Sequence, residues 1–147
     1  MPVTTHSTDD LAALLRARGQ RVTSQRLVIL RELRRRAHHV TAHDVCEAVR
    51  HELPGTSTPT VYATLELLVE LGLVRKLCFD AGTALYDART EPHQHVVCRH
   101  CGRVEDLDIE LDCDSVLAAA RATGFDPDGA ELVIAGSCAP CAEATRA

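Results

Sequence analysis

Two Cys-x-x-Cys pairs constrain this chain more than any other feature of its sequence. The first pair is Cys98 and Cys101, the second is Cys138 and Cys141, and 36 residues separate them. Each pair can present two thiolates to one ion from a tight turn, and two pairs complete the tetrahedral four-sulfur shell that suits zinc. Such a shell leaves no open coordination position, so we predict a structural zinc site rather than a catalytic one.

The alternatives to zinc at these pairs are a redox dithiol and two disulfides. A redox pair typically opens a helix after a strand, and one such pair is sufficient. The N-terminus has no signal sequence and no apolar run approaches the roughly 18–20 residues that span a bilayer. We therefore expect a reducing, cytoplasmic location without a membrane partner. For the remaining cysteines, Cys46, Cys78 and Cys113, we expect packing, with a redox thiol as the alternative.

Charge is distributed unevenly along the chain. Residues 1–90 hold 12 Lys and Arg against 10 Asp and Glu, and residues 91–147 hold 4 against 11, which returns the totals of 16 and 21. A cluster of arginines lies near the start: Arg16, Arg18, Arg21, Arg26, Arg31, Arg34, Arg35 and Arg36. A basic stretch on an acidic protein indicates a phosphate-binding face, and a solvated helix surface is the alternative.

The first half of the chain has the pattern of four helices followed by a hairpin. Apolar spacing predicts helices over residues 9–18, from 23, over 41–52 and from 57 to 72, with Asp9 or Asp10, Thr23, Thr41 and Ser57 as caps. Two extended runs, 73–79 and 84–86, flank a connection at 80–83 and predict a β-hairpin. Short helices followed by a hairpin are typical of a winged helix-turn-helix, whose second helix enters the DNA major groove.

The second half is short, at about 55 residues, and cannot bury a generous core alone. We predict strands at 95–97, 103–108 and 131–135 and a helix over 114–122. The segment needs a metal, a partner chain or both for stability.

A second group of metal donors precedes the first cysteine pair. His93 and His95 are two residues apart, so in a strand both imidazoles point to one face. Asp106 lies on the returning strand, Asp87 ends the hairpin, and three histidines, His38, His39 and His43, lie at the start of the third helix. Each of these alone is more often a surface residue, but together they predict a second metal site.

These motifs together make the sequence recognisable. The relevant stretches are residues 21–26 (RVTSQR), 60–65 (TVYATL), 72–74 (GLV), 86–87 (YD), 93–102 (HQHVVCRHCG) and 136–141 (GSCAPC). In this order and spacing they resemble the ferric uptake regulator (Fur) family over nearly the whole chain. The resemblance implies an α+β fold in which residues 1–88 form a winged-helix DNA-binding domain and 89–92 a hinge. Residues 93–147 would then form a small α/β dimerisation and metal-binding domain with the zinc knuckle.

The resemblance also implies a function and its residues. It implies a homodimeric repressor, not an enzyme, that binds a palindromic double-stranded DNA operator when a regulatory metal is present. The implied regulatory Fe(II) or Mn(II) ligands are His39, Asp87, His93, His95 and Asp106. The implied DNA-contacting residues are Arg21, Arg26, Ser57, Thr58, Thr60 and Tyr62.

Aspartate at both carboxylate positions, 87 and 106, is similar to the peroxide-sensing branch of the family. This similarity implies that peroxide, the only small-molecule substrate expected, oxidises His39 or His93 to 2-oxo-histidine and releases the DNA. The alternatives are an iron-, zinc- or nickel-uptake regulator of the same fold, a thiol oxidoreductase that uses Cys-x-x-Cys, and a zinc-stabilised protein-interaction module.

Overall fold

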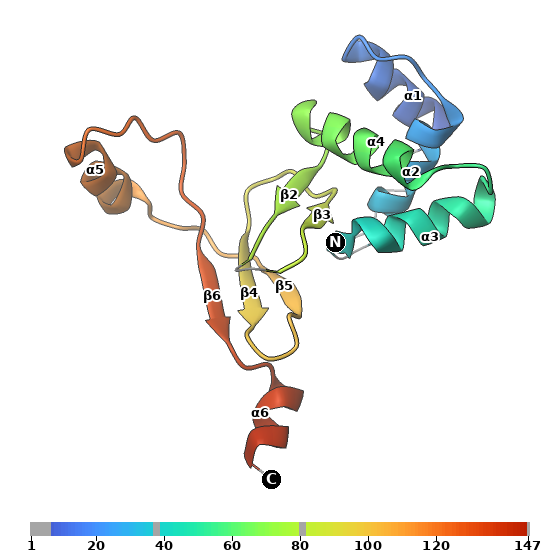
Figure 1. Ribbon diagram of the computed structural model, residues 1–147. Coiled ribbons are helices and arrows are strands. Elements are labelled where there is room, and N and C mark those ends of the chain that lie inside the picture. Colours follow the sequence, from blue (N-terminus) through green and yellow to red (C-terminus); the bar gives the residue numbers. More distant parts are fainter. Residues whose placement is uncertain (1–6, 37–38, 80–81, 147) are drawn as a thin grey trace. The chain divides into compact units, whose positions relative to one another are not determined.

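The computed structural model describes residues 7–36, 39–79 and 82–146. The chain divides into two compact units, Met1–Thr90 and Glu91–Ala147 (Figure 1). Asp80 and Ala81, half of the predicted hairpin connection, lie outside the described residues.

The first unit contains the four predicted helices: α1 (Thr8–Ala17), α2 (Ser24–Arg35), α3 (Ala42–Glu52) and α4 (Thr58–Glu70). Three of the predicted caps are confirmed. Thr23 and Ser57 accept hydrogen bonds from the backbone N–H three residues on, at 3.3 Å in both cases. Thr41 and Asp44 form a reciprocal capping box, which satisfies two of the N–H groups that a helix start leaves without partners.

The predicted cap of α1 is wrong. Ser7 is the N-cap, and its hydroxyl accepts from the backbone N–H of Asp10 at 3.1 Å, while the Asp10 carboxylate accepts from the Ser7 N–H at 3.0 Å. Asp10 therefore lies three residues inside the helix as the acidic partner of the capping box. A serine followed by an acid three positions later was the sequence pattern that identifies this start.

Helices of the first unit share one hydrophobic core. Ile29, Leu30, Leu65, Leu68 and Val45 are completely buried in it. Truncating one of these aliphatic side chains to alanine costs typically about 2–5 kcal/mol, so this core holds α4 firmly against α2 and α3. Cys46 is buried here too, with 3% of its surface exposed, which confirms the prediction of packing for this cysteine. The same prediction is wrong for Cys78, which is exposed, because it follows the last residue of the strand Arg75–Leu77.

A small antiparallel sheet completes the first unit. Its strands are β1 (Val40–Thr41), β2 (Arg75–Leu77) and β3 (Leu85–Asp87), in the order β1-β3-β2. β2 and β3 confirm the predicted hairpin, with shorter strands than expected, and β1 was not predicted because two residues carry no periodicity. Gly72 has a φ of 68° and ends α4, so the chain turns directly into the hairpin.

The second unit is built on a mixed sheet. Its strands are β4 (Gln94–Cys98), β5 (Val104–Leu107) and β6 (Val133–Gly136), in the order β5-β4-β6. β5 pairs with β4 in antiparallel fashion, whereas β6 is parallel to β4 and is reached through α5 (Asp114–Ala122). A last helix, α6 (Ala139–Arg146), follows β6 and was not predicted.

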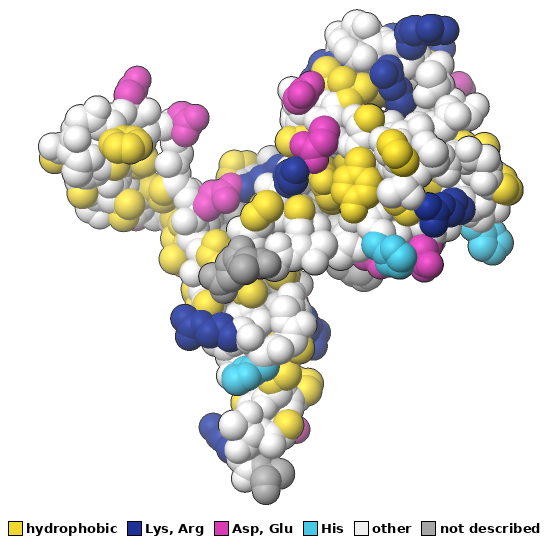
Figure 2. All heavy atoms as spheres, viewed as in Figure 1, with side chains coloured by type: hydrophobic (Ala, Val, Ile, Leu, Met, Phe, Trp, Pro, Cys, Tyr) yellow, Lys and Arg dark blue, Asp and Glu magenta, His cyan; other side chains and the backbone are white. Residues whose placement is uncertain are grey.

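Very few apolar side chains of the second unit are buried. Among the described hydrophobic residues with little exposed surface, only Cys98 belongs to this unit. Large apolar side chains remain exposed instead: Ile109, Val116, Phe125, Val133 and Ile134. Figure 2 shows hydrophobic side chains at the surface of the lobe that contains α5. None of the described helices is long and apolar enough to cross a membrane.

Candidate metal centres

Four cysteine sulfurs of the second unit converge on one point. One Sγ atom from each of Cys98, Cys101, Cys138 and Cys141 lies within 4.8 Å of the other three. The Sγ atoms of Cys101 and Cys138 are 3.7 Å apart. Zinc–sulfur bonds of about 2.3 Å in a tetrahedron place ligand sulfurs about 3.8 Å apart, whereas a disulfide requires about 2.05 Å. The cluster therefore fits a structural zinc site, and all its cysteines are unbridged.

Each cysteine pair is held by its local backbone. The first lies between β4 and β5, where Gly102, with a φ of 74°, lets the chain reverse, and its N–H donates to the Cys98 carbonyl at 3.0 Å. Cys138 and Cys141 lie where β6 passes into α6. This strand-to-helix position is typical of a redox pair, but the approach of the other two sulfurs favours a metal site.

The ionisation of the thiols supports the same conclusion. Backbone N–H groups, that of Cys138 foremost, lower the pKa of Cys98 to about 5. The sulfurs of Cys138 and Cys101 raise the pKa of Cys141 to about 12, because they hydrogen-bond its thiol and a further thiolate would be repelled. A divalent cation removes this conflict, since zinc binds deprotonated thiols.

Two buried imidazoles and a carboxylate form a second cluster in this unit. The side chains of His93 and His95 are fully buried, and their ring centroids lie 4.6 Å apart. Asp106, directly opposite His95 in the β4–β5 pairing, places Oδ1 3.3 Å from His93 Nε2 and 3.9 Å from His95 Nε2. Burying such polar groups is costly unless they are paired or bind a metal.

Outer contacts orient these donors. His93 Nδ1 lies 2.8 Å from the Glu91 carbonyl oxygen, which can only accept, so Nδ1 carries the proton and the Nε2 lone pair is directed towards Asp106. This arrangement is characteristic of metal-binding histidines. The Gln94 amide oxygen accepts from the Leu132 N–H at 2.6 Å and fixes the start of β4 beside β6. Neither contact was predicted, because a backbone partner leaves no mark in the sequence.

The first unit contributes a separate histidine–aspartate pair. His39 immediately precedes β1 and Asp87 ends β3, and the pairing of Val40 with Tyr86 brings them opposite one another. His39 Nε2 lies 3.6 Å from Asp87 Oδ2, and 5% and 11% of the two side chains are exposed. Asp87 Oδ1 accepts from the Arg89 N–H at 2.8 Å, which directs the other oxygen to His39.

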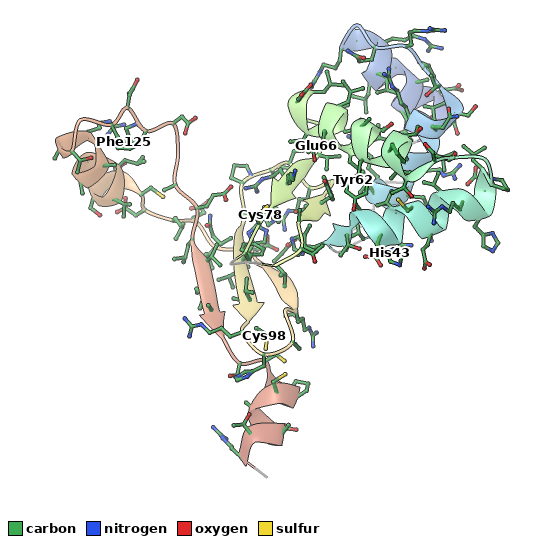
Figure 3. All side chains as sticks on the ribbon, in the orientation of Figure 1. His43, Tyr62, Glu66, Cys78, Cys98 and Phe125 are labelled. Carbon is green, nitrogen blue, oxygen red and sulfur yellow. The ribbon has the colours of Figure 1, made fainter. Side chains whose placement is uncertain are left out.

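The predicted DNA-contacting residues of α4 lie at its N-terminal end. Ser57, Thr60 and Tyr62 are exposed, and 47% of the Tyr62 surface is accessible (Figure 3). Ser57 and Thr60 hydroxyls lie 2.8 Å apart as part of the cap. Thr58 is half-buried and accepts a hydrogen bond from Arg50.

The arginine-rich stretch is only partly available to a ligand. Arg31, Arg35 and Arg36 lie within 3.9 Å of the Glu32 carboxylate. Arg26 donates to the Arg21 carbonyl at 2.9 Å, whereas the Arg21 side chain is exposed. About half of the predicted phosphate-binding face is therefore engaged in holding the unit together.

A helical unit closed by a small antiparallel sheet, followed by a unit with a four-cysteine metal site, defines a zinc-containing winged-helix protein. The model of the "Ferric uptake regulator family" matches residues 17–134. Because this match spans most of the chain, the protein belongs to the ferric uptake regulator (Fur) family of metal-dependent transcription regulators, which are not enzymes.

Known relatives span several members of this family. The chain is 40% identical over 125 residues to ferric uptake regulation protein 1 of Mycolicibacterium fortuitum, covering 84% of this chain and 77% of that one. It is 30% identical to the peroxide-responsive repressor PerR of Staphylococcus aureus, over 92% of both chains. A zinc uptake regulator solved in complex with zinc and DNA superposes with a TM-score of 0.68 at 26% identity, covering 97% of this chain and 99% of that one.

Proposed function

We propose that this protein is a DNA-binding repressor that senses peroxide through one Fe(II) or Mn(II) ion held by His39, Asp87, His93, His95 and Asp106. The observation that carries the proposal is the buried cluster of His93 and His95 around the Asp106 carboxylate. Three imidazoles and two carboxylates form a borderline-to-hard donor set, which suits Fe(II) or Mn(II) better than thiolate-preferring ions.

The shared ion would couple metal binding to DNA binding. Two ligands belong to the first unit and three to the second, so one ion bound by all five would fix the orientation of one unit against the other. An operator that selects this orientation would raise the affinity for the metal by the same factor as the metal raises the affinity for DNA. Metal dependence would then follow from linkage alone.

The first unit would read the DNA through the N-terminal end of α4. Ser57, Thr58, Thr60 and Tyr62 are the proposed contacts to base edges and nearby backbone, and Arg21 and Arg26 the proposed phosphate contacts. The complex of the related zinc uptake regulator with DNA supports this role. The exposed apolar side chains of the second unit support a homodimer, and a dimer would match a palindromic operator.

Peroxide sensing would follow from the chemistry of the proposed site. Bound ferrous iron would supply the electron that reduces peroxide. His39 and His93 would lie beside the oxidant. Overall, one peroxide would take two electrons from one of these imidazoles, transfer one oxygen atom to its ring and leave its other oxygen as water, and the resulting 2-oxo-histidine would be a weaker ligand. Support comes from aspartate at both carboxylate positions and from the similarity to PerR of S. aureus.

An iron-uptake regulator without peroxide sensing is the second candidate, because the M. fortuitum relative at 40% identity bears that name. The two candidates differ in one response. Both predict metal-dependent DNA binding. Only the peroxide sensor, loaded with Fe(II), loses its DNA binding irreversibly after a brief peroxide pulse. The same protein loaded with Mn(II) stays bound to DNA.

The test is DNA binding by the purified protein with Fe(II) and with Mn(II), before and after that pulse, measured by fluorescence anisotropy on operator DNA selected from a random pool. His39→Ala should abolish the metal response. His43→Ala is the matched control, because the side chain of His43 is 76% exposed on α3 and lies outside the proposed site.

Mass spectrometry locates the oxidation. Cleavage at arginine gives residues 37–50, with three histidines, and 90–99, with two, so fragment ions must assign the added oxygen to His39 or His93. Oxidation confined to cysteines would instead indicate a thiol switch, and metal-independent DNA binding would contradict the proposed function itself.

A further inference from the structure

A carboxylate on α4 holds two side chains of the sheet at once. Glu66 Oε1 accepts from the Tyr86 hydroxyl at 2.9 Å and from Lys76 Nζ at 2.7 Å. Figure 3 labels Glu66 on α4, together with Tyr62 on the same helix. The Lys76 ammonium also lies 6.0 Å from the centre of the Tyr86 ring. One atom of Glu66 therefore links α4 to both β2 and β3.

Tyr86 occupies the centre of the small sheet. It pairs with Val40 of β1 on one side and with Lys76 of β2 on the other. Its side chain is buried in the hydrophobic core, with 2% of the residue exposed. Because successive side chains of a strand point to opposite faces, Tyr86 faces the helices while Asp87 faces away from them.

Both proposed metal ligands of the first unit lie next to the paired residues Val40 and Tyr86. His39 directly precedes Val40, and Asp87 directly follows Tyr86. A change in the position of Asp87 or His39 therefore displaces the backbone on which Tyr86 is carried. Since the Tyr86 ring is packed on all sides, that displacement is transmitted to its hydroxyl rather than absorbed by a change of rotamer.

The other end of the link leads to the proposed DNA-contacting residues. Glu66 lies four residues after Tyr62, so both side chains lie on one face of α4, one turn apart. The intervening helix is held by the buried side chains of Val61, Leu65 and Leu68, so we expect it to respond as one rigid body. The orientation of α4 is thus tied to the strand that carries Asp87.

Resting on the proposed function, we propose that Tyr86 and Glu66 are positioning residues whose hydrogen bond transmits metal binding at His39 and Asp87 to α4. In this account the regulatory ion acts within the first unit as well as between the units. The hydroxyl is the essential atom, because phenylalanine would fill the same space in the core and leave α4 without its link to β3.

The experiment measures the coupling factor, which is the DNA affinity with saturating Mn(II) divided by the DNA affinity without metal. The variants are Tyr86→Phe and Glu66→Met in the full-length chain, and the double variant completes the cycle; methionine has a similar length to glutamate but offers the Tyr86 hydroxyl no oxygen acceptor. Lys76→Met is the matched control, since it removes the other hydrogen bond of Glu66 but keeps the one from Tyr86. We expect the coupling factor to fall about tenfold in both single variants and no further in the double variant.

A purely structural role would change DNA affinity equally with and without metal and leave the coupling factor unchanged. That result in both variants, or an equal fall in Lys76→Met, would overturn the proposal. Glu66→Met keeps the test decisive if Tyr86→Phe folds poorly, because the side chain of Glu66 is half-exposed and lies outside the hydrophobic core. A wild-type coupling factor of one would contradict the proposed function, whereas a wild-type response that Tyr86→Phe retains would contradict only this inference.

Discussion

Removing one zinc ligand should unfold the second unit and leave the first unit intact. The variant is Cys138→Ser, which breaks the cluster at the cysteine whose Sγ lies 3.7 Å from that of Cys101 and whose N–H donates to Cys98. The apolar core of the described residues lies almost entirely in the first unit, and Cys98 is the one buried hydrophobic residue of the second. Metal binding therefore has to replace the missing core.

The expected loss exceeds what the second unit can tolerate. Structural zinc sites contribute about 10–16 kcal/mol in small domains, and whole domains are stable by only about 5–15 kcal/mol. The first unit keeps its own core and helices of 10 to 13 residues, so most of the helical circular dichroism should remain. Size-exclusion chromatography with light scattering should show monomers. The proposed dimer forms through the exposed apolar surface of the second unit, and this surface loses its order when the unit unfolds.

The assay follows zinc content, thermal unfolding and oligomeric state together. Cys78→Ser is the control, since Cys78 is exposed and lies outside the four-sulfur cluster, and it should behave like the wild type. Two results would refute the reasoning: a Cys138→Ser protein that keeps the wild-type melting curve, or one in which both units unfold in a single transition.

Three further predictions concern single residues of the first unit. Arg21→Ala should weaken binding to all DNA sequences and lower the slope of log affinity against log salt by about one, whereas Tyr62→Ala should mainly reduce the preference for the operator over random DNA. Asp44→Ala should cost about 1 kcal/mol near pH 7, measured by urea unfolding. Hydrogen bonds from Thr41 lower the pKa of Asp44 in the folded protein. The ionised carboxylate therefore stabilises the fold fully at pH values above its pKa in the unfolded chain. The difference in unfolding free energy between wild type and variant should vanish as the pH falls through the lowered pKa of the folded state. Alkylation of the native protein should modify exposed Cys78 rapidly and Cys46, 3% exposed, only after unfolding.

Regular, local patterns predicted most of this fold. Caps such as Thr23, Thr41 and Ser57 act through a backbone N–H three residues away, so the sequence alone specifies them. The strand β1 was missed because it exists only through its pairing with β3, and α6 because its eight residues follow a cysteine pair and lack a clear apolar face. Tertiary pairing, rather than propensity, decides such short elements.

The donor residues of the metal centres were predictable, but their surroundings were not. Spacing alone predicted that the side chains of Cys98 and Cys101, or of His93 and His95, lie close to one another. The Glu91 carbonyl that orients His93 and the Glu66 carboxylate that joins α4 to the sheet act over contacts that no motif records. The arginines beside Glu32 show the opposite error, since a basic run in the sequence is partly neutralised in the fold.

The most direct test of the shared regulatory ion is Mn(II) affinity, followed by the electron paramagnetic resonance signal of free Mn(II), in two aspartate variants from different units. Asp87→Ala and Asp106→Ala should each weaken the tight manganese site of the wild type by at least about tenfold, while Asp126→Ala, an exposed residue, should not. If Asp106→Ala loses manganese but Asp87→Ala retains wild-type affinity, the ion belongs to the second unit alone and does not join the two.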